Sequence, residues 1–172
     1  MAIEAENGFQ LECGGCGATA EALPLASLCT ACGSPQLVRY SALQELGPDV
    51  AARWADRPRG MWRFSEILPL RPGESPISLG EGDTPLLPLC RLGEELGLRL
   101  LMKDEGRNPT GSFKDRGLAA AVTRAVHDGA REFVIPSAGN AGAALAAYAA
   151  RAGVTARIYL PEDTPRGVEV RC

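Results

Sequence analysis

The sequence predicts an α/β protein with a mostly parallel sheet and helices on both faces, preceded by a small cysteine-rich unit. Three observations lead to this prediction. With 45% apolar and 23% charged residues, a chain of 172 residues can bury a core. After Gly80, apolar runs of strand length alternate with amphipathic runs of helix length, as in parallel sheets covered by helices. Before residue 41, four of the six cysteines form two close pairs.

Changes in composition divide the chain into three regions. Residues 1–40 are rich in cysteine and glycine, and they are too few to bury a core without a cross-link. Residues 41–79 are expected to form a wrapping connector with one short helix near 43–54, because prolines interrupt any longer element. Residues 80–172 form the α/β region. The prolines of the connector are Pro48, Pro58, Pro69, Pro72 and Pro76.

The elements of the α/β region follow from apolar periodicity and from glycines at helix ends. One helix begins where Ser112 and Asp115 stand three residues apart, as in a capping box, and ends before Gly129. The next helix is rich in alanine and is closed by Gly153. The expected order is a helix over 89–96, a strand over 98–102, a helix over 113–127, a strand over 133–135, a helix to about residue 152 and a strand over 156–160.

The paired cysteines have the spacing of a metal site. The pattern is C-x2-C, twelve residues and C-x2-C, and a glycine follows each pair. Four thiolates on two such turns can surround one zinc ion tetrahedrally, which makes the metal structural rather than catalytic. Two disulfides or reduced core thiols are the alternative, which the lack of a secretory signal disfavours. The predicted zinc ligands are Cys13, Cys16, Cys29 and Cys32.

Charge limits the classes of partner. The formal net charge is −3, and the sequence pI is about 5.3. Residues 1–40 carry four glutamates and only Arg39 as a basic residue, so the cysteine-rich unit lacks the footprint for nucleic acid. No apolar run is long enough to span a bilayer. We therefore expect a cytoplasmic protein with a small soluble ligand, bound neither to nucleic acid nor to membrane.

A lysine is the strongest candidate for chemistry. The one histidine, His127, falls at a helix end, where it complements the helix dipole and is poorly placed for catalysis. Of 18 basic residues only Lys103 and Lys114 are lysines, and lysine can lose its proton and attack a carbonyl. Lys114 falls on the first turn of a helix, whose positive end disfavours the ammonium form. Lys103 is explained by an ion pair with Asp104 or Glu105, and an ordinary surface lysine is the alternative at position 114.

A second loop, Ser-Ala-Gly-Asn at 137–140, joins a strand to a helix. Such a turn directs backbone N–H groups and the positive helix end toward an anionic group. The side-chain amide of Asn140 can donate to a phenolate oxygen. Any tight turn between a strand and a helix has this appearance, so the loop is informative only together with the lysine helix.

Several motifs together resemble a known family. The stretches NPTGSFKDRG at 108–117, SAGN at 137–140, AAYAARAG at 146–153, GEGDTPL at 80–86 and MWRF at 61–64 are similar to fold-type-II enzymes that use pyridoxal 5′-phosphate (PLP). The similarity is greatest to threonine synthases that carry an N-terminal zinc ribbon. It implies part of a tryptophan synthase beta-like fold, with a zinc ribbon over 1–40, the connector over 41–79 and an incomplete catalytic domain over 80–172.

The resemblance also implies roles for individual residues. Lys114 would carry PLP as a Schiff base and Asn140 would bond the ring oxygen of the cofactor. Phe113 would pack near the ring and Thr84 would lie close to the substrate. The rest of the second loop would hold a substrate carboxylate through Ser137, Ala138 and Gly139.

The implied reaction converts O-phospho-L-homoserine and water to L-threonine and phosphate. Threonine or serine dehydratases and cysteate synthase share this pocket chemistry and remain alternatives, as does a non-catalytic remnant that acts as a zinc-ribbon interaction module. Family members are longer than 172 residues, and the part without a counterpart here includes the loop that holds the PLP phosphate. The resemblance therefore implies a truncated chain with little or no activity alone, which a complementary chain or a homo-oligomer would complete.

Overall fold

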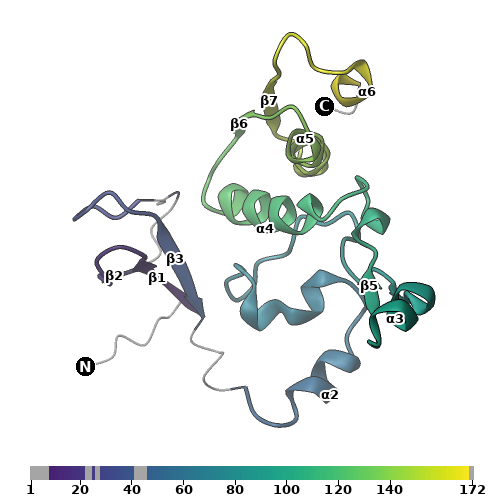
Figure 1. Ribbon diagram of the computed structural model, residues 1–172. Coiled ribbons are helices and arrows are strands. Elements are labelled where there is room, and N and C mark those ends of the chain that lie inside the picture. Colours follow the sequence, from purple (N-terminus) through teal and green to yellow (C-terminus); the bar gives the residue numbers. More distant parts are fainter. Residues whose placement is uncertain (1–7, 22–24, 26–27, 41–45, 171–172) are drawn as a thin grey trace. The chain divides into compact units, whose positions relative to one another are not determined.

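The computed structural model describes residues 8–21, 25, 28–40 and 46–170, and it divides the chain into two compact units (Figure 1). Unit 1 comprises Met1–Pro58, Trp62–Pro76 and Ala120–Arg131, and unit 2 comprises Arg59–Met61, Ile77–Ala119 and Glu132–Cys172. Among the described residues, no helix is both long and apolar enough to cross a membrane.

The cysteine-rich part of unit 1 is a small antiparallel sheet. Strands β1 (Phe9–Cys13), β2 (Thr19–Ala20) and β3 (Gln36–Tyr40) lie in the order β2-β1-β3. Its apolar core consists of Phe9 and Leu11, with Tyr40 packed against them. The rings of Phe9 and Tyr40 are 6.0 Å apart. A core of this size cannot stabilise a fold by itself, which agrees with the expected need for a cross-link.

The connector in unit 1 carries the short helix that the sequence predicts. Helix α2 spans Val50–Ala55, within and just beyond the expected range of 43–54, of which residues 43–45 lie outside the described part. The 3-10 helix η1 follows over Met61–Ile67. The Trp54 indole donates to Glu66 at 3.0 Å, and Arg57 pairs with the same carboxylate at 2.5 Å. These bonds fold the connector onto itself.

An ion-pair cluster joins the connector to the end of α4 (Lys114–His127) within unit 1. Arg124 donates to both carboxylate oxygens of Glu74, at 2.6 and 2.8 Å, and to Asp128 at 3.1 Å. Arg71 donates to Asp128 at 2.8 Å. Burial raises the pKa of Glu74 and Asp128, but bonds from the arginines outweigh it, so both pKa values lie below their ordinary range. His127 bonds the carbonyl of Ser75 at 2.8 Å, which fits the structural role expected for it.

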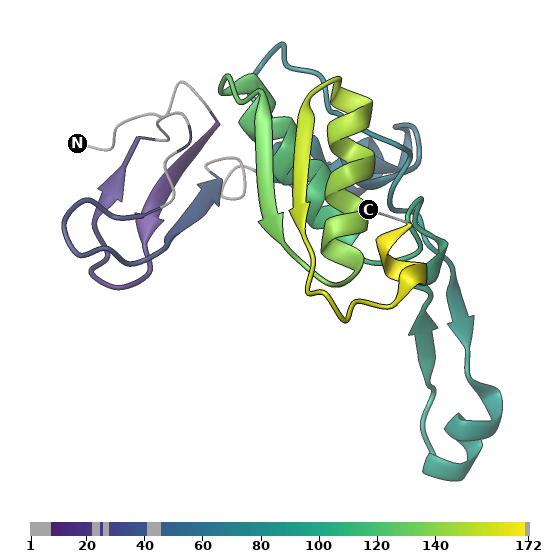
Figure 2. The ribbon, with the colours of Figure 1, turned by 90° about the horizontal axis from the view of Figure 1, so that it is seen from above.

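Unit 2 contains the predicted parallel arrangement. Strands β6 (Glu132–Pro136) and β7 (Thr155–Tyr159) pair in parallel and are connected by helix α5 (Asn140–Ala152). Figure 2 shows α5 lying along this pair of strands. The alternate residues of both strands are half-buried, whereas Val134 and Tyr159 on the other face are 60% and 62% exposed. In the described part of the chain, α5 thus covers one face of the pair.

The strand expected over 98–102 differs from the prediction in its position and pairing. Strand β5 spans Leu101–Lys103 and pairs antiparallel with β4 (Leu86–Pro88), so it does not join the parallel pair. Between them, α3 (Cys90–Leu96) ends at Gly97, whose φ is +64°, and the N–H of Leu98 bonds the carbonyl of Gly93 at 2.9 Å. This left-handed helix end reverses the chain and returns it beside β4. Figure 2 shows β4, α3 and β5 as an arm of unit 2.

The remaining elements agree closely with the prediction. Helix α4 begins at Lys114, one residue after the expected start, and ends at His127 as expected. Gly129, with φ of +100°, turns the chain toward β6. Helix α5 ends at Ala152, and Gly153 is its C-cap, as predicted. Three short helices, η1, η2 (Glu105–Arg107) and α6 (Arg166–Glu169), were not expected.

Candidate active site and metal centre

The loop before Lys114 is fixed by its own polar side chains. The N–H of Gly111 donates to the carbonyl of Asn108 at 2.8 Å, closing a turn in which Gly111 has φ of +82°. Asp115 is fully buried, and its carboxylate accepts the N–H of Thr110 at 2.7 Å and the Thr110 hydroxyl. The Ser112 hydroxyl accepts the N–H of Lys114 at 3.3 Å. Ser112 therefore caps the helix as expected, while Asp115 closes the loop instead of completing a capping box.

Lys114 lies at the first residue of α4 with its side chain half-buried. Its Nζ is 4.4 Å from the centroid of the Phe113 ring, and that ring is 57% exposed. An amine over an aromatic face is in a favourable position, so contact with the Phe113 ring restricts the orientation of the Lys114 side chain. A flat, exposed ring beside a half-buried amine is suited to contact with a planar ligand.

The second predicted loop begins α5. The N–H of Ser137 bonds the carbonyl of Tyr159 at 3.0 Å, which extends the parallel ladder, and the Ser137 hydroxyl accepts the N–H of Gly142 at 3.1 Å. Gly139 is the N-cap, and Asn140 is exposed at the first helical position. The first turns of α4 and α5 lie at the same end of the β6–β7 pair (Figure 2). The positive ends of both helix dipoles therefore lie at the same end of the strand pair, where they favour an anionic group.

Thr84 belongs to a polar cluster beside the lysine loop. It is 5% exposed, and its hydroxyl donates to Glu105 at 2.6 Å. Arg116 donates to the same carboxylate at 2.7 and 2.8 Å and to the Thr84 hydroxyl at 3.2 Å. The side-chain amide of Asn108 donates to Glu105 at 2.9 Å. Bonds from Arg116, followed by those from Thr84 and Asn108, outweigh burial and lower the pKa of Glu105 to about 2.

This cluster contains residues for which the sequence predicts no role in the site. Asn108 has no role in the prediction, and Glu105 enters it only as a possible ion-pair partner of Lys103, although a carboxylate and an amide directly after a strand are a recognisable signal. Arg116 is an ion-pair residue. Lys103 donates to the carbonyl of Thr84 and not to the neighbouring carboxylates indicated by the sequence. The contact between Thr84 and a substrate stays a prediction.

The four predicted zinc ligands converge in unit 1. Their sulfur atoms all lie within 4.8 Å of one another, with Cys13 to Cys32 at 3.4 Å and Cys16 to Cys29 at 3.8 Å. Zinc–sulfur bonds of about 2.3 Å in a tetrahedron place sulfurs about 3.8 Å apart, so the cluster has the required size. Among the described residues, no cysteine forms a disulfide.

The electrostatics of the sulfur cluster favour a cation. The N–H groups of Cys16 and Gly15 each donate to the Cys13 sulfur at 3.3 Å and lower the pKa of that thiol. Bonds from Ser34 lower the pKa of Cys32 to about 6. The N–H of Ala18 lowers the pKa of Cys16, but the neighbouring sulfurs outweigh it and raise that pKa to about 11. Four thiols this close cannot all ionise unless a cation compensates the charge.

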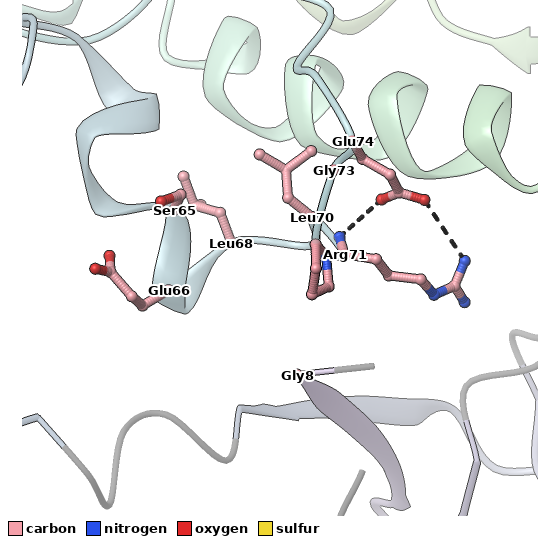
Figure 3. Close-up of a pocket in the computed structure, with 9 residues that line it drawn as sticks. Gly8, Ser65, Glu66, Leu68, Leu70, Arg71, Gly73 and Glu74 are labelled. Atoms are coloured by element: carbon pink, nitrogen blue, oxygen red, sulfur yellow. Dashed lines mark hydrogen bonds and ion pairs between the residues drawn. The ribbon is translucent and has the colours of Figure 1, made fainter. Parts of the chain in front are cut away.

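A cavity of about 360 Å³ in unit 1 contains none of the predicted site residues. It lies between Gly8 at the start of the small sheet and the connector (Figure 3). Glu66 and Glu74 contribute to its lining, but Arg57 and Arg124 already pair with these carboxylates. Arg71, which also lines it, donates its backbone N–H to Glu74 at 2.7 Å. The charged groups that line this cavity therefore already form ion pairs or hydrogen bonds within the protein.

Several known proteins are similar to this chain. The family described as "Pyridoxal-phosphate dependent enzyme" matches residues 77–171. Threonine synthases from Halalkalibacterium halodurans and Methanocaldococcus jannaschii are both 48% identical to the chain, over 99 and 104 residues. These matches cover 58% and 60% of this chain and 28% and 26% of the relatives. The threonine synthase of Methanosarcina acetivorans is 36% identical over 154 residues, which is 89% of this chain and 37% of the relative.

Among solved structures, the processed form of threonine deaminase isoform 2 from Solanum lycopersicum has 26% sequence identity and a TM-score of 0.47, over 51% of this chain and 24% of that one. The chain spans between 26% and 37% of the length of the three threonine synthases. The predicted α/β fold of type II and the predicted relation to threonine synthases are confirmed. Because the matched region covers more than half of its residues, the chain belongs to the family of pyridoxal-phosphate dependent enzymes.

Proposed function

We propose that this chain provides Lys114, and the loop that positions it, to a PLP site in an enzyme of the threonine synthase type. The enzyme would convert O-phospho-L-homoserine and water to L-threonine and phosphate. The observation that carries the proposal is the position of Lys114, half-buried on the first turn of α4 behind a loop closed by Asn108 and Asp115. The threonine synthases similar to this chain, at 36–48% identity, support the choice of substrate.

The residues present fit the cofactor. Bound PLP would supply an electron sink for the carbanion formed at the substrate α-carbon. Lys114 would hold the cofactor through its amine and, once released, would move a proton at that carbon. The exposed amide of Asn140 would donate to the ring oxygen, and Phe113 would pack near the ring.

Substrate recognition would use the start of α5. Ser137, Ala138 and Gly139 precede a positive helix end, which suits a carboxylate. Thr84 already donates its hydroxyl proton to Glu105, so it would meet a substrate through its oxygen lone pairs.

Two further parts of the proposal concern the isolated chain. Because it spans between 26% and 37% of the length of those relatives, we propose that it has little or no turnover alone and that a homo-oligomer or a complementary chain completes the site. One zinc ion would bind Cys13, Cys16, Cys29 and Cys32 and stabilise the small sheet of unit 1. The cytoplasmic location stays a prediction.

The test is the visible absorption spectrum of the purified chain with added PLP, followed by borohydride reduction and peptide mass mapping. A Schiff-base band that borohydride fixes at Lys114 is expected, together with its loss in Lys114→Ala. Lys103→Arg is the control, because it keeps a positive donor beside Thr84 and leaves Lys114 in place. A chain that is folded by circular dichroism and yet is not labelled at Lys114 would contradict the proposal.

A further inference from the structure

Glu81 is a buried carboxylate without a role in the proposed chemistry. It is 1% exposed, and one oxygen of its carboxylate accepts three hydrogen bonds. The donors are the Ser78 hydroxyl at 3.1 Å, the N–H of Leu79 at 3.0 Å and the Tyr148 hydroxyl at 2.8 Å. A charge in the interior is costly unless it is bonded in this way, so the position of Glu81 depends on its donors.

The bond to Tyr148 fixes helix α5. Tyr148 is fully buried, and burial followed by the contact with Glu81 raises its pKa, so its hydroxyl keeps the proton that it donates. Arg151, three residues later and on the same face of the helix, donates to the carbonyl of Ser78 at 3.1 Å. Asn140 lies eight residues before Tyr148, which is about 12 Å along the helix axis. A helix held at Tyr148 and Arg151 therefore presents Asn140 at a fixed place.

The same segment is bonded to the lysine loop on its other side. The N–H of Gly82, next to Glu81, donates to the side-chain oxygen of Asn108 at 3.0 Å. The carbonyl of Asn108 closes the turn that leads to Lys114. Two residues beyond Gly82, the Thr84 hydroxyl donates to Glu105. Residues 78–84 are thus bonded to α5 and also to the loop that carries Lys114.

The backbone around Glu81 leaves little room for movement. The carbonyl of Glu81 accepts the N–H of Met61 at 2.9 Å. Gly82 has φ of +91°, and a Cβ atom added there would lie 2.5 Å from the Met61 nitrogen. The main chain of the segment is therefore held as firmly as the Glu81 side chain.

We propose that Glu81 is a positioning residue that sets the place of Asn140 relative to Lys114. Its carboxylate fixes α5 through Tyr148, while the following residues fix the lysine loop through Asn108. The positions of the two loops are therefore coupled through residues 78–84, and the bond between Glu81 and Tyr148 is the buried link of this segment to α5. The inference deepens the proposed function, because Lys114 and Asn140 are the two residues assigned to the cofactor.

Amide hydrogen exchange tests the coupling without any cofactor. Tyr148→Phe removes the hydroxyl and keeps the ring, and Tyr159→Phe is the matched control because Tyr159 is 62% exposed. At a temperature well below unfolding, Tyr148→Phe should accelerate exchange at both 108–115 and 137–142 by about fivefold or more, and the control should change neither. Glu81→Ala should behave like Tyr148→Phe, and Glu81→Gln, which keeps an acceptor, should lie closer to wild type. Faster exchange at 137–142 with no change at 108–115 would overturn the proposal.

Labelling with PLP and borohydride adds a readout of the amine, with Lys103 as an internal reference. The ratio of Lys114 to Lys103 labelling should fall in Tyr148→Phe and stay at the wild-type value in Tyr159→Phe. An unchanged ratio in a variant that only unfolds at a lower temperature would mean that Glu81 is merely structural. If wild type does not favour Lys114, the proposed function fails, and the exchange measurement still decides the coupling.

Discussion

Arg116 and Glu105 form a two-point ion pair, in which the guanidinium donates to the two carboxylate oxygens at 2.7 and 2.8 Å. Arg116 lies two residues after Lys114, and Glu105 also accepts from Thr84 and Asn108. The pair therefore holds the first turn of α4 against the loop that precedes it. The planar fork of arginine matches a carboxylate in a way that lysine does not.

Replacing Glu105 by Gln should lower the free energy of unfolding in a pH-dependent manner. The folded state lowers the Glu105 pKa from its ordinary 4.5 to about 2, so the pair contributes stability above pH 4.5 and loses it as the pH falls toward 2. The side chains are 25% and 33% exposed, and with solvent screening we expect a loss of about 1–2 kcal/mol at pH 7. Urea unfolding of Glu105→Gln and of wild type at several pH values measures this loss of unfolding free energy.

The matched control is Glu132→Gln, which removes an ion pair with Arg157 whose side chains are 47% and 61% exposed. It should cost less than about 0.5 kcal/mol because exposed pairs contribute little. A difference between Glu105→Gln and wild type that grows on acidification would contradict the assignment.

Two glycines of unit 2 should respond to alanine in opposite directions. Gly82→Ala should cost more than about 2 kcal/mol, because φ is +91° and the new Cβ meets the Met61 nitrogen. Gly117→Ala should stabilise the protein by about 0.5–1 kcal/mol, because this residue lies inside α4 and nothing approaches within 4 Å of the added carbon. Thermal unfolding of both variants measures the effects. Equal midpoints would show that the segment at Gly82 is not held close to Met61.

The hydroxyl of Thr110 should matter more than its methyl group. Thr110→Val keeps the shape but removes a donor to the fully buried Asp115, which should cost about 1–3 kcal/mol. Thr110→Ser keeps the donor and should remain close to wild type. Guanidinium unfolding gives the stabilities. Similar losses in both variants would mean that packing of the methyl group, not the hydrogen bond to Asp115, holds the loop.

The cysteine cluster should bind one zinc ion per chain. Cys32→Ser should abolish binding, because four sulfurs are needed to close the tetrahedron, and Cys90→Ser should retain it, because Cys90 is an exposed thiol outside the cluster. Metal analysis after gel filtration measures the content, and hydrogen exchange of residues 9–13 should accelerate when zinc is lost. Equal zinc content in both variants would place the metal elsewhere.

Local patterns predicted much of this protein. The spacing of the cysteines placed four sulfurs within reach of one metal ion, although their side chains come from two separate turns. The ends of α4 and α5 followed from Gly129 and Gly153, because a left-handed residue at a helix end is a local property. The parallel pairing of β6 and β7 followed from the strand–helix–strand order.

Long-range contacts decided the rest. The short helix α3 ends in a reversal of the chain, which places β5 antiparallel to β4. Apolar periodicity cannot predict this pairing, because it carries no information on the relative direction of two strands. The partners of Glu81 and Glu105 are up to 67 residues away in sequence. The sequence by itself determined which residues are the candidates for the chemistry, since their types and spacing are local. Only the tertiary structure decided which carboxylates hold the loops that carry them, because the cost of burying a charged group is met by donors from distant segments.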